Sequence, residues 1–255
     1  MTFTIITTVL NNERFVLDCL KSVQKQNFNK KKLEHLIIDG GSTDQTIKII
    51  KKFKRDNNYI KLFQKKNFSI YQAINFGIKL SKNKYIGLLH SDDYFFNKNV
   101  LNILQKTFTK NNDIKAIYSN VNIVSRYNKK KILRYFKSRN LTKKNYLRYE
   151  HPPHPSLFLE KNVFRKYGLY KEKFKIAADF DFMLRIFGIN QVKSLYLDKI
   201  LVVMRSGGTS TKSLKNIIAS NYEVIKSIRE NNLKINLIYI FIKILRKIFQ
   251  VKLFN

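Results

Sequence analysis

The sequence predicts an α/β fold with a mostly parallel central sheet flanked by helices. Over the first hundred residues, β-branched apolar runs alternate with segments whose apolar residues recur at helical spacing. Strands separated by helices of this length imply parallel pairing through right-handed crossovers. The 255 residues include 44% hydrophobic residues, 8 Gly and 3 Pro, so a folded domain is expected and a disordered or linker-rich chain is excluded.

The first elements alternate strictly between strand and helix. The apolar run Phe3 to Val9 predicts a strand, and it precedes a helical pattern over 13–26 with Asn11 or Asn12 as the expected N-cap. The alternation continues with a strand over 33–39, a turn over 40–43, a helix around 47–53, a strand over 59–63, a helix over 71–80 and a strand over 84–89.

Beyond residue 110 the pattern is looser, and we interpret it as the second half of the same domain. Short strands are predicted over 114–124, 131–136 and 156–159, and a helix over 179–187. Residues 233–255 carry five basic residues and no acid, with Lys243 and Lys247 on one side of a predicted helix. Such a helix either lies on an anionic bilayer or packs on the domain.

The chain is strongly basic, with 50 Lys and Arg against 17 Asp and Glu, a net charge of +33. The charge is spread over nearly every segment and accompanies 27 Asn, which favours a coding bias with a moderate preference for anionic surfaces over a binding function of the charge itself. No known nucleic-acid motif is present, so no specific nucleic-acid partner is expected. The single Cys19 fits a reducing compartment, and neither a signal peptide nor a membrane-spanning segment is expected.

The scarce acids follow predicted strands. Asp39 ends the second strand, Asp44 lies in the loop after it, and Asp92 and Asp93 follow the strand that ends at Leu89. In open α/β sheets ligands bind beyond the carboxyl ends of the strands. We therefore expect a binding site at this edge.

Four blocks in order resemble the inverting family 2 glycosyltransferases with a GT-A fold, over roughly residues 1–210. They are IITTVLNNE at 5–13, IIDGGSTD at 37–44, GLLHSDD at 87–93 and IAADFDFMLR at 176–185. The resemblance implies a Rossmann-like sheet with a nucleotide-sugar-binding half at 1–110, an acceptor-binding half at 111–210 and a basic helical tail at 211–255. It also implies a role in bacterial polysaccharide or lipopolysaccharide synthesis.

The resemblance implies a divalent cation, Mg²⁺ or Mn²⁺, held on carboxylates to neutralise the diphosphate leaving group. The family's Asp-x-Asp site aligns with His90-Ser91-Asp92, so Asp92 and Asp93 are the expected metal ligands and His90 a further candidate. Turn formation or helix capping is the alternative for the two acids, and an ordinary strand-end histidine is the alternative for His90.

The same resemblance places the nucleotide on the first strand ends. A carboxylate such as Asp39 can accept the imide N–H of uracil or thymine, although an acid before Gly40 also forms turns. Asp44 is as well explained as a helix N-cap. The expected donor-binding residues are Thr7, Val9, Asn11, Glu13, Asp39, Ser91, Asp92 and Arg205, the last to answer diphosphate charge.

Inverting transfer needs one base to take a proton from the acceptor hydroxyl. Asp179 aligns with the family's base, and Asp181 is the competitor. On a helix these two side chains lie about 200° apart, so one is expected to be catalytic and the other structural, capping or pairing with Arg185. His154 resembles an acceptor-side histidine, with a structural hydrogen bond as the alternative.

The sequence therefore predicts a metal-dependent enzyme that moves a sugar from a nucleotide-diphosphate donor to a hydroxyl of a glycan or lipid-linked acceptor. Its expected location is the cytoplasmic face of the cell membrane. One alternative is a sugar nucleotidyltransferase, but such an enzyme needs a Gly-rich loop after the first strand, and residues 10–13 of this chain contain no Gly. The other alternative is a basic nucleic-acid-binding protein. A catalytically inactive relative is a further alternative, because His90 and Asn67 stand where relatives often carry Asp.

Overall fold

The structure is a computed structural model, and it describes residues 1–208, 213–236, 238 and 239. Over these residues nine strands form one sheet in the order β3-β2-β1-β4-β8-β6-β9-β5, with β7 paired to β6. The strands are β1 (Phe3–Val9), β2 (Leu33–Asp39), β3 (Ile60–Gln64), β4 (Tyr85–Leu88), β5 (Tyr94–Phe95), β6 (Ala116–Val124), β7 (Ile132–Phe136), β8 (Phe158–Glu160) and β9 (Ser194–Arg205).

The helices connect these strands on both faces of the sheet. They are α1 (Val16–Gln24), α2 (Thr46–Arg55), α3 (Ile70–Leu80), α4 (Val100–Lys110), α5 (Lys143–Leu147), α6 (Lys161–Tyr167), α7 (Ala178–Met183) and α8 (Leu214–Glu230). Short 3₁₀ turns occupy Lys30–Lys32 and His154–Ser156, and a π-helix, Leu184–Ile189, continues α7. Within the described residues, no helix combines the length and the apolar character that crossing a membrane requires.

The first half of the sheet is parallel, as the alternating pattern predicts. β1 pairs in parallel with both β2 and β4, and β2 pairs in parallel with β3. All seven residues of β2 are buried, because helices cover both of its faces. The carboxyl ends of these strands therefore meet at one edge, where Val9, Asp39 and Leu88 end their strands.

The second half of the sheet is mixed. β8 is antiparallel to both β4 and β6, whereas β6 is parallel to β9 over a long register. The strand expected over 156–159 begins only at Phe158, because residues 154–156 form a 3₁₀ turn, and the helix expected over 179–187 is α7 followed by the π-helix. The predicted α/β fold, with a mostly parallel sheet and flanking helices, is confirmed.

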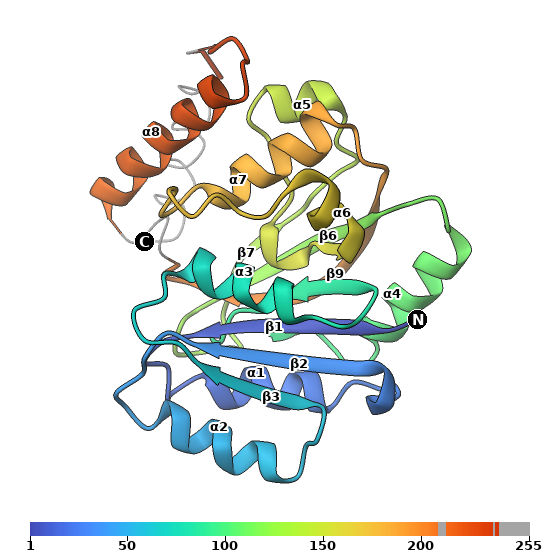
Figure 1. Cartoon of the computed structure of the whole chain (residues 1–255), viewed down its shortest axis with the longest axis vertical. Coiled ribbons are helices and arrows are strands. Elements are labelled where there is room, and N and C mark those ends of the chain that lie inside the picture. The colour runs from blue at the N-terminus through green and yellow to red at the C-terminus, as the bar shows by residue number, and fades with distance from the viewer. Residues whose placement is uncertain (209–212, 237, 240–255) are drawn as a thin grey trace.

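Two layers of helices enclose the sheet. Figure 1 shows α3 on the opposite side of β1–β3 from α1 and α2. The core under α3 also contains residues of α7 and α8, including Val224 and Ile228, which are at most 1% exposed. The first helix of the predicted 211–255 tail therefore packs on the domain, whereas the amphipathic stretch from Ile240 lies outside the described residues.

The expected N-cap of the first helix is wrong. Phe15 occupies the N-cap position of α1, without a capping hydrogen bond from its side chain. Asn11 adopts a positive φ of 46°, and its Oδ1 accepts a hydrogen bond from Thr43 N at 2.8 Å. Asn12 donates from Nδ2 to Ser91 Oγ at 2.7 Å. Both amides therefore tie the loop after β1 to its neighbours instead of capping the helix.

Candidate active site

A cleft of about 660 Å³ opens at the carboxyl ends of β1, β2 and β4. Its floor is formed by strand ends of the first half, and its far wall by the loop that leads into α7. Most of the predicted site residues line it: Val9, Asn11, His90, Ser91, Asp92, Asp93, His154, Asp179 and Arg205. These residues span almost two hundred positions in sequence, and the fold gathers them in one place.

Thr7, Glu13 and Asp39 do not line this cleft. Thr7 is fully buried, and its Oγ1 lies 2.9 Å from His35 Nε2 on the core side of β1. Side chains alternate across a strand, so Thr8 faces the cleft in its place, 3.3 Å from His90 Nδ1. The alternation of side chains along the strand could therefore have identified Thr8 from the sequence.

Asp39 is buried within the turn that follows β2. Its carboxylate accepts hydrogen bonds from Gly41 N at 3.0 Å and from Ser42 N at 3.1 and 3.2 Å. Gly41 has a φ of 110°, which a residue with a side chain adopts at a cost. The turn-forming alternative for Asp39 thus matches its contacts, and its contact with a nucleotide base stays a prediction.

Glu13 and Asp44 join the loops after β1 and β2. Glu13 Oε2 accepts from Gln45 N at 2.8 Å, and Asp44 Oδ2 accepts from Glu13 N at 3.1 Å. Asp44 also accepts from Thr46 N at the start of α2, and although burial opposes the effect, these hydrogen bonds lower its pKa. Both acids stabilise the rim of the cleft through backbone groups.

The block that replaces the family's Asp-x-Asp site forms a tight turn after β4. Asp93 N donates to His90 O at 2.9 Å, which turns the chain so that Asp92 points into the cleft. Burial lowers the pKa of His90, against the opposing charges of Asp92 and Asp179. His90 lines the cleft together with the two acids, and burial favours its neutral form.

Asp92 and Asp93 occupy different environments. The side chain of Asp92 is 27% exposed and accepts from Arg126 Nη1 at 3.2 Å. Asp93 is only 3% exposed and accepts from the backbone N of Arg205 at 3.2 Å. Burial, with the neighbouring Asp92 charge, raises the pKa of Asp93 well above its usual range. Asp92 is thus the accessible carboxylate that a ligand reaches at this strand end.

The two arginines near these acids also differ in their exposure to the cleft. Arg205 is 5% exposed, pairs with Asp18 and lies over the ring of Phe15, 4.6 Å from its centroid. Its guanidinium is therefore committed to an internal ion pair. Arg126 comes from the loop after β6, lines the cleft and contacts Asp92, and no feature of the sequence identified it beforehand.

The side chains that line the cleft determine whether a metal ion can bind there. Among the residues that the structure describes, no three His, Cys, Asp or Glu side chains converge on a point where they alone would hold a cation. Mg²⁺ commonly takes one or two protein carboxylates and completes its shell with water and substrate phosphates. Asp92 provides one such carboxylate, so the site fits a cation shared with a bound diphosphate.

The two acids of α7 separate as helical geometry predicts. Asp179 is partly exposed and lines the cleft. Asp181 is fully buried and accepts from Arg185 Nε at 2.8 Å and from Lys171 Nζ at 3.1 Å. Burial alone would raise the pKa of Asp181, but Arg185 and Lys171 outweigh it and lower that pKa. The predicted pairing of Asp181 with Arg185 is present, and Asp179 is left facing the cleft.

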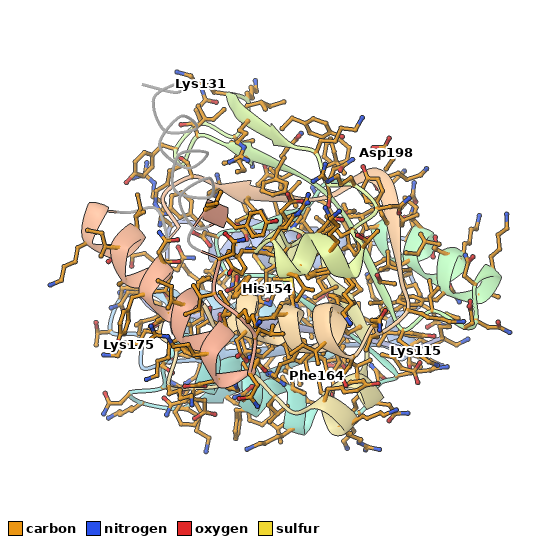
Figure 2. All side chains as sticks on the ribbon, turned by 90° about the horizontal axis from the view of Figure 1, so that it is seen from above. Lys115, Lys131, His154, Phe164, Lys175 and Asp198 are labelled. Carbon is orange, nitrogen blue, oxygen red and sulfur yellow. The ribbon has the colours of Figure 1, made fainter. Side chains whose placement is uncertain are left out.

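His154 lies beside Asp179 in the wall of the cleft. It is 8% exposed, and its Nε2 lies 2.8 Å from the hydroxyl of Tyr170. Burial lowers the pKa of His154 to about 4, against the opposing charge of Asp179. Figure 2 shows His154 nearer the middle of the molecule and Lys175, another cleft residue, toward its edge. The structural hydrogen bond considered for His154 exists, and contact with an acceptor stays a prediction.

A family model and several relatives match this chain. The model for glycosyl transferase family 2 matches residues 4–168. Chondroitin synthase of Pasteurella multocida is 27% identical over 225 residues, which cover 84% of this chain and 22% of that protein. The chain spans 15% to 20% of the length of the relatives that it matches at 36% to 40% identity.

Two solved structures share the fold. Staphylococcus aureus TarS 1-349 in complex with UDP-GlcNAc superposes with a TM-score of 0.69 at 19% identity, covering 98% of this chain and 73% of that one. The mannosyltransferase PcManGT of Pyrobaculum calidifontis, in complex with GDP-Man and Mn²⁺, gives 0.65 at 14% identity, covering 88% and 64%. Because the family model matches well over half of its residues, the chain belongs to glycosyl transferase family 2.

Proposed function

We propose that this chain is an inverting glycosyltransferase that moves a sugar from a nucleotide-diphosphate donor to a hydroxyl of a glycan or lipid-linked acceptor. One observation carries the proposal: Asp179 and Asp92 line the same cleft and are partly exposed there, whereas Asp181 lies outside it and Asp93, although in its lining, is buried. The cleft thus offers one carboxylate for proton removal and a separate carboxylate with a cation, Arg126, for the diphosphate.

The reaction follows from this placement. Asp179 accepts the proton of the acceptor hydroxyl, and the hydroxyl oxygen forms a bond to the anomeric carbon of the donor sugar. The bond between that carbon and the diphosphate oxygen breaks, and the nucleoside diphosphate leaves with the electron pair. Because attack and departure occur on opposite faces, the anomeric configuration inverts.

The diphosphate is received by Arg126 in place of Arg205. A guanidinium matches the geometry of phosphate oxygens, and Arg126 already contacts Asp92 inside the cleft. A divalent cation, Mg²⁺ or Mn²⁺, would be held by Asp92 and the substrate, and it would neutralise charge on the leaving group. Mn²⁺ in the PcManGT complex supports a metal requirement.

The relatives suggest the class of donor and product. TarS binds UDP-GlcNAc in its solved complex, and chondroitin synthase is named for a polysaccharide. We infer a nucleoside-diphosphate sugar as donor and cell-surface polysaccharide synthesis as the role, with His154 contacting the acceptor. We also infer that Val9, Asn11 and Ser91, which line the cleft, contact the donor.

Substitution of the base tests the proposal. D179N keeps the shape of the side chain but removes the proton acceptor, and a general base contributes about 10²- to 10⁴-fold to a rate. We expect kcat to fall in that range, while donor affinity measured by calorimetry with Mn²⁺ stays within twofold. D113N is the matched control, because Asp113 is an exposed acid far from the cleft. Near-normal turnover by D179N would contradict the assignment.

We also propose that the chain docks on the anionic cytoplasmic face of the cell membrane. Along α8, Lys215, Ile218, Tyr222, Lys226 and Arg229 are exposed and lie on one face, opposite the buried Val224. Ile218 and Tyr222 are 71% and 68% exposed. Apolar side chains flanked by cations fit the headgroup region of an anionic bilayer.

Co-sedimentation with vesicles tests this docking. Vesicles containing phosphatidylglycerol should retain the wild-type chain, and neutral phosphatidylcholine vesicles should retain much less. The double variant I218S/Y222S should lose this binding. I132S, at an apolar residue of β7 that is 59% exposed, should keep it. Equal binding by all three proteins would contradict docking through α8.

A further inference from the structure

The loop that leads into α7 is bound by a carboxylate from a distant helix. Glu223, in the middle of α8, accepts three backbone hydrogen bonds of 2.8 Å each. Its Oε1 accepts from Lys175 N, and its Oε2 accepts from both Ile176 N and Ala177 N. One side chain thus fixes three consecutive amides that end two residues before Asp179.

The same loop is held from its other side. Tyr71, on α3, donates from its hydroxyl to Ile176 O at 2.8 Å. Both the N–H groups and a carbonyl of this segment are therefore fixed by side chains that lie 46 to 105 residues away in sequence. α7 itself has no side-chain cap from its N-cap residue, Ala177, and the segment before the helix is held by these remote groups.

A second set of contacts joins α7 to α8. Ser227 Oγ donates to Asp181 Oδ1 at 2.8 Å, and Asn231 Nδ2 donates to the same oxygen at 3.1 Å. Glu223, Ser227 and Asn231 are four residues apart, so they share one face of the helix and its continuation. That face contacts the acid-bearing segment on both sides of Asp179.

The geometry points to Glu223 as a positioning residue for the base Asp179. This inference rests on the proposed function, because it assigns Glu223 a part in the step that Asp179 performs. Glu223 does not line the cleft. It acts through the backbone of 175–177, whose position sets where the Asp179 carboxylate meets the acceptor hydroxyl.

The chemistry of the side chain predicts a graded response. In E223Q the amide oxygen can keep two of the three hydrogen bonds, but the NH₂ group then faces another N–H donor, so one bond is lost together with the charge. E223A loses all three. Displacement of a reacting group by about 1 Å costs on the order of 10²-fold in rate, so the turnover should fall in the order wild type, E223Q, E223A.

The experiment combines kinetics with hydrogen exchange on the full chain. We expect E223Q to lower kcat by about tenfold or more while the Kd for UDP-GlcNAc with Mn²⁺, the probe donor, stays within twofold. Amide exchange of 175–177, measured by mass spectrometry, should accelerate in E223Q. E230Q is the matched control, because Glu230 is on the same helix and its ion pairs among the described residues are with Lys171 and Lys173.

The outcomes separate the two claims. Wild-type turnover in E223Q and E223A, or a loss no greater than that of E230Q, would overturn the role of Glu223 even if the chain transfers sugar. The proposed function would be overturned if the wild-type chain binds the donor but transfers no sugar to a hydroxyl acceptor. Fast amide exchange of 175–177 in E223Q would still support the binding of this segment by Glu223. If E223A fails to fold, E223Q still decides the matter, because it is isosteric.

Discussion

The two sides of the cleft are built by different means. On the side of β1 and β2, the groups that shape the rim are bound by backbone and side chains of the adjacent loop, as Asp39 is by Gly41 and Ser42. On the side of α7, Asp179 is placed by Glu223 and Tyr71, which lie far away in sequence. The side of β1 and β2 is therefore held by contacts within and between the loops that follow β1, β2 and β4, whereas the segment before Asp179 is held by two helices that belong to other parts of the chain.

The largest expected effect comes from removing the buried charge of Asp181, next to the segment before Asp179, in comparison with that of Glu34, at the amino end of β2 away from the cleft. Breaking a buried ion pair by removing one partner costs about 3–5 kcal/mol, so D181A should destabilise the chain by that amount, because Arg185 and Lys171 lose their partner. E34A, on β2, should cost clearly less, because its partner Lys61 is 44% exposed and water screens the pair. Urea unfolding measures both. Equal losses of unfolding free energy in D181A and E34A would contradict the expected difference.

A smaller effect is expected from pH at His154. The pKa of His154 is about 4 in the folded chain against 6.5 without burial, so the unfolded chain binds the proton first as the pH falls. The contribution of His154 is complete above pH 6.5 and is lost as the pH falls toward 4. At 1.36 kcal/mol per pKa unit the loss is about 3 kcal/mol. H154Q should flatten the dependence of the unfolding free energy on pH over this window, and an unchanged slope would contradict the assignment.

The arginines provide the next comparison. A hydrogen bond to a charged group contributes about 1.5–3 kcal/mol, so R126Q should raise the Kd for a nucleotide-sugar donor by about 10- to 100-fold. R205Q should lower the melting temperature instead, because Asp18 would lose its buried partner. Calorimetry and thermal unfolding of both variants separate the two roles. The two roles would be reversed if the donor Kd is unchanged in R126Q and raised in R205Q.

The smallest effect concerns the helix starts. α3 is capped by its own sequence, since Ser69 Oγ accepts from Gln72 N and Gln72 Oε1 accepts from Ser69 N. Loss of such a cap costs about 1 kcal/mol, so S69A should lower the unfolding free energy by that amount. Exchange of the amides at 175–177 should not change in S69A. A change there would show that the two helix starts are coupled.

Much of the first half could be predicted from the sequence. The strand predicted over 33–39 matches β2 residue for residue, and its centre, Leu36 to Ile38, is the continuous apolar run typical of a parallel strand covered on both faces. The separation of Asp179 from Asp181 also followed from helical geometry alone. The mixed pairing of β8 and the π-helix could not be predicted, because neither carries a local period that sets it apart.

Some site residues could not be predicted from the sequence for the same reason. Arg126 stands in a basic stretch where no pattern distinguishes one cation from the next, and only its contact with Asp92 singles it out. Arg205 carries the same charge but is buried against Asp18. In Figure 2 nitrogen-tipped side chains project around the whole periphery, so composition alone could not tell a functional cation from a solvated one.

The sequence by itself determined the α/β class, the order of the first strands and helices and the edge of the sheet where the acids gather, because these follow from side-chain periodicity and chain direction. Only the tertiary structure decided which of those acids face the cleft and which are buried, and that Glu223 binds the loop before Asp179. Periodicity is a property of neighbours in the chain, whereas burial and charge pairing depend on residues that meet only after folding.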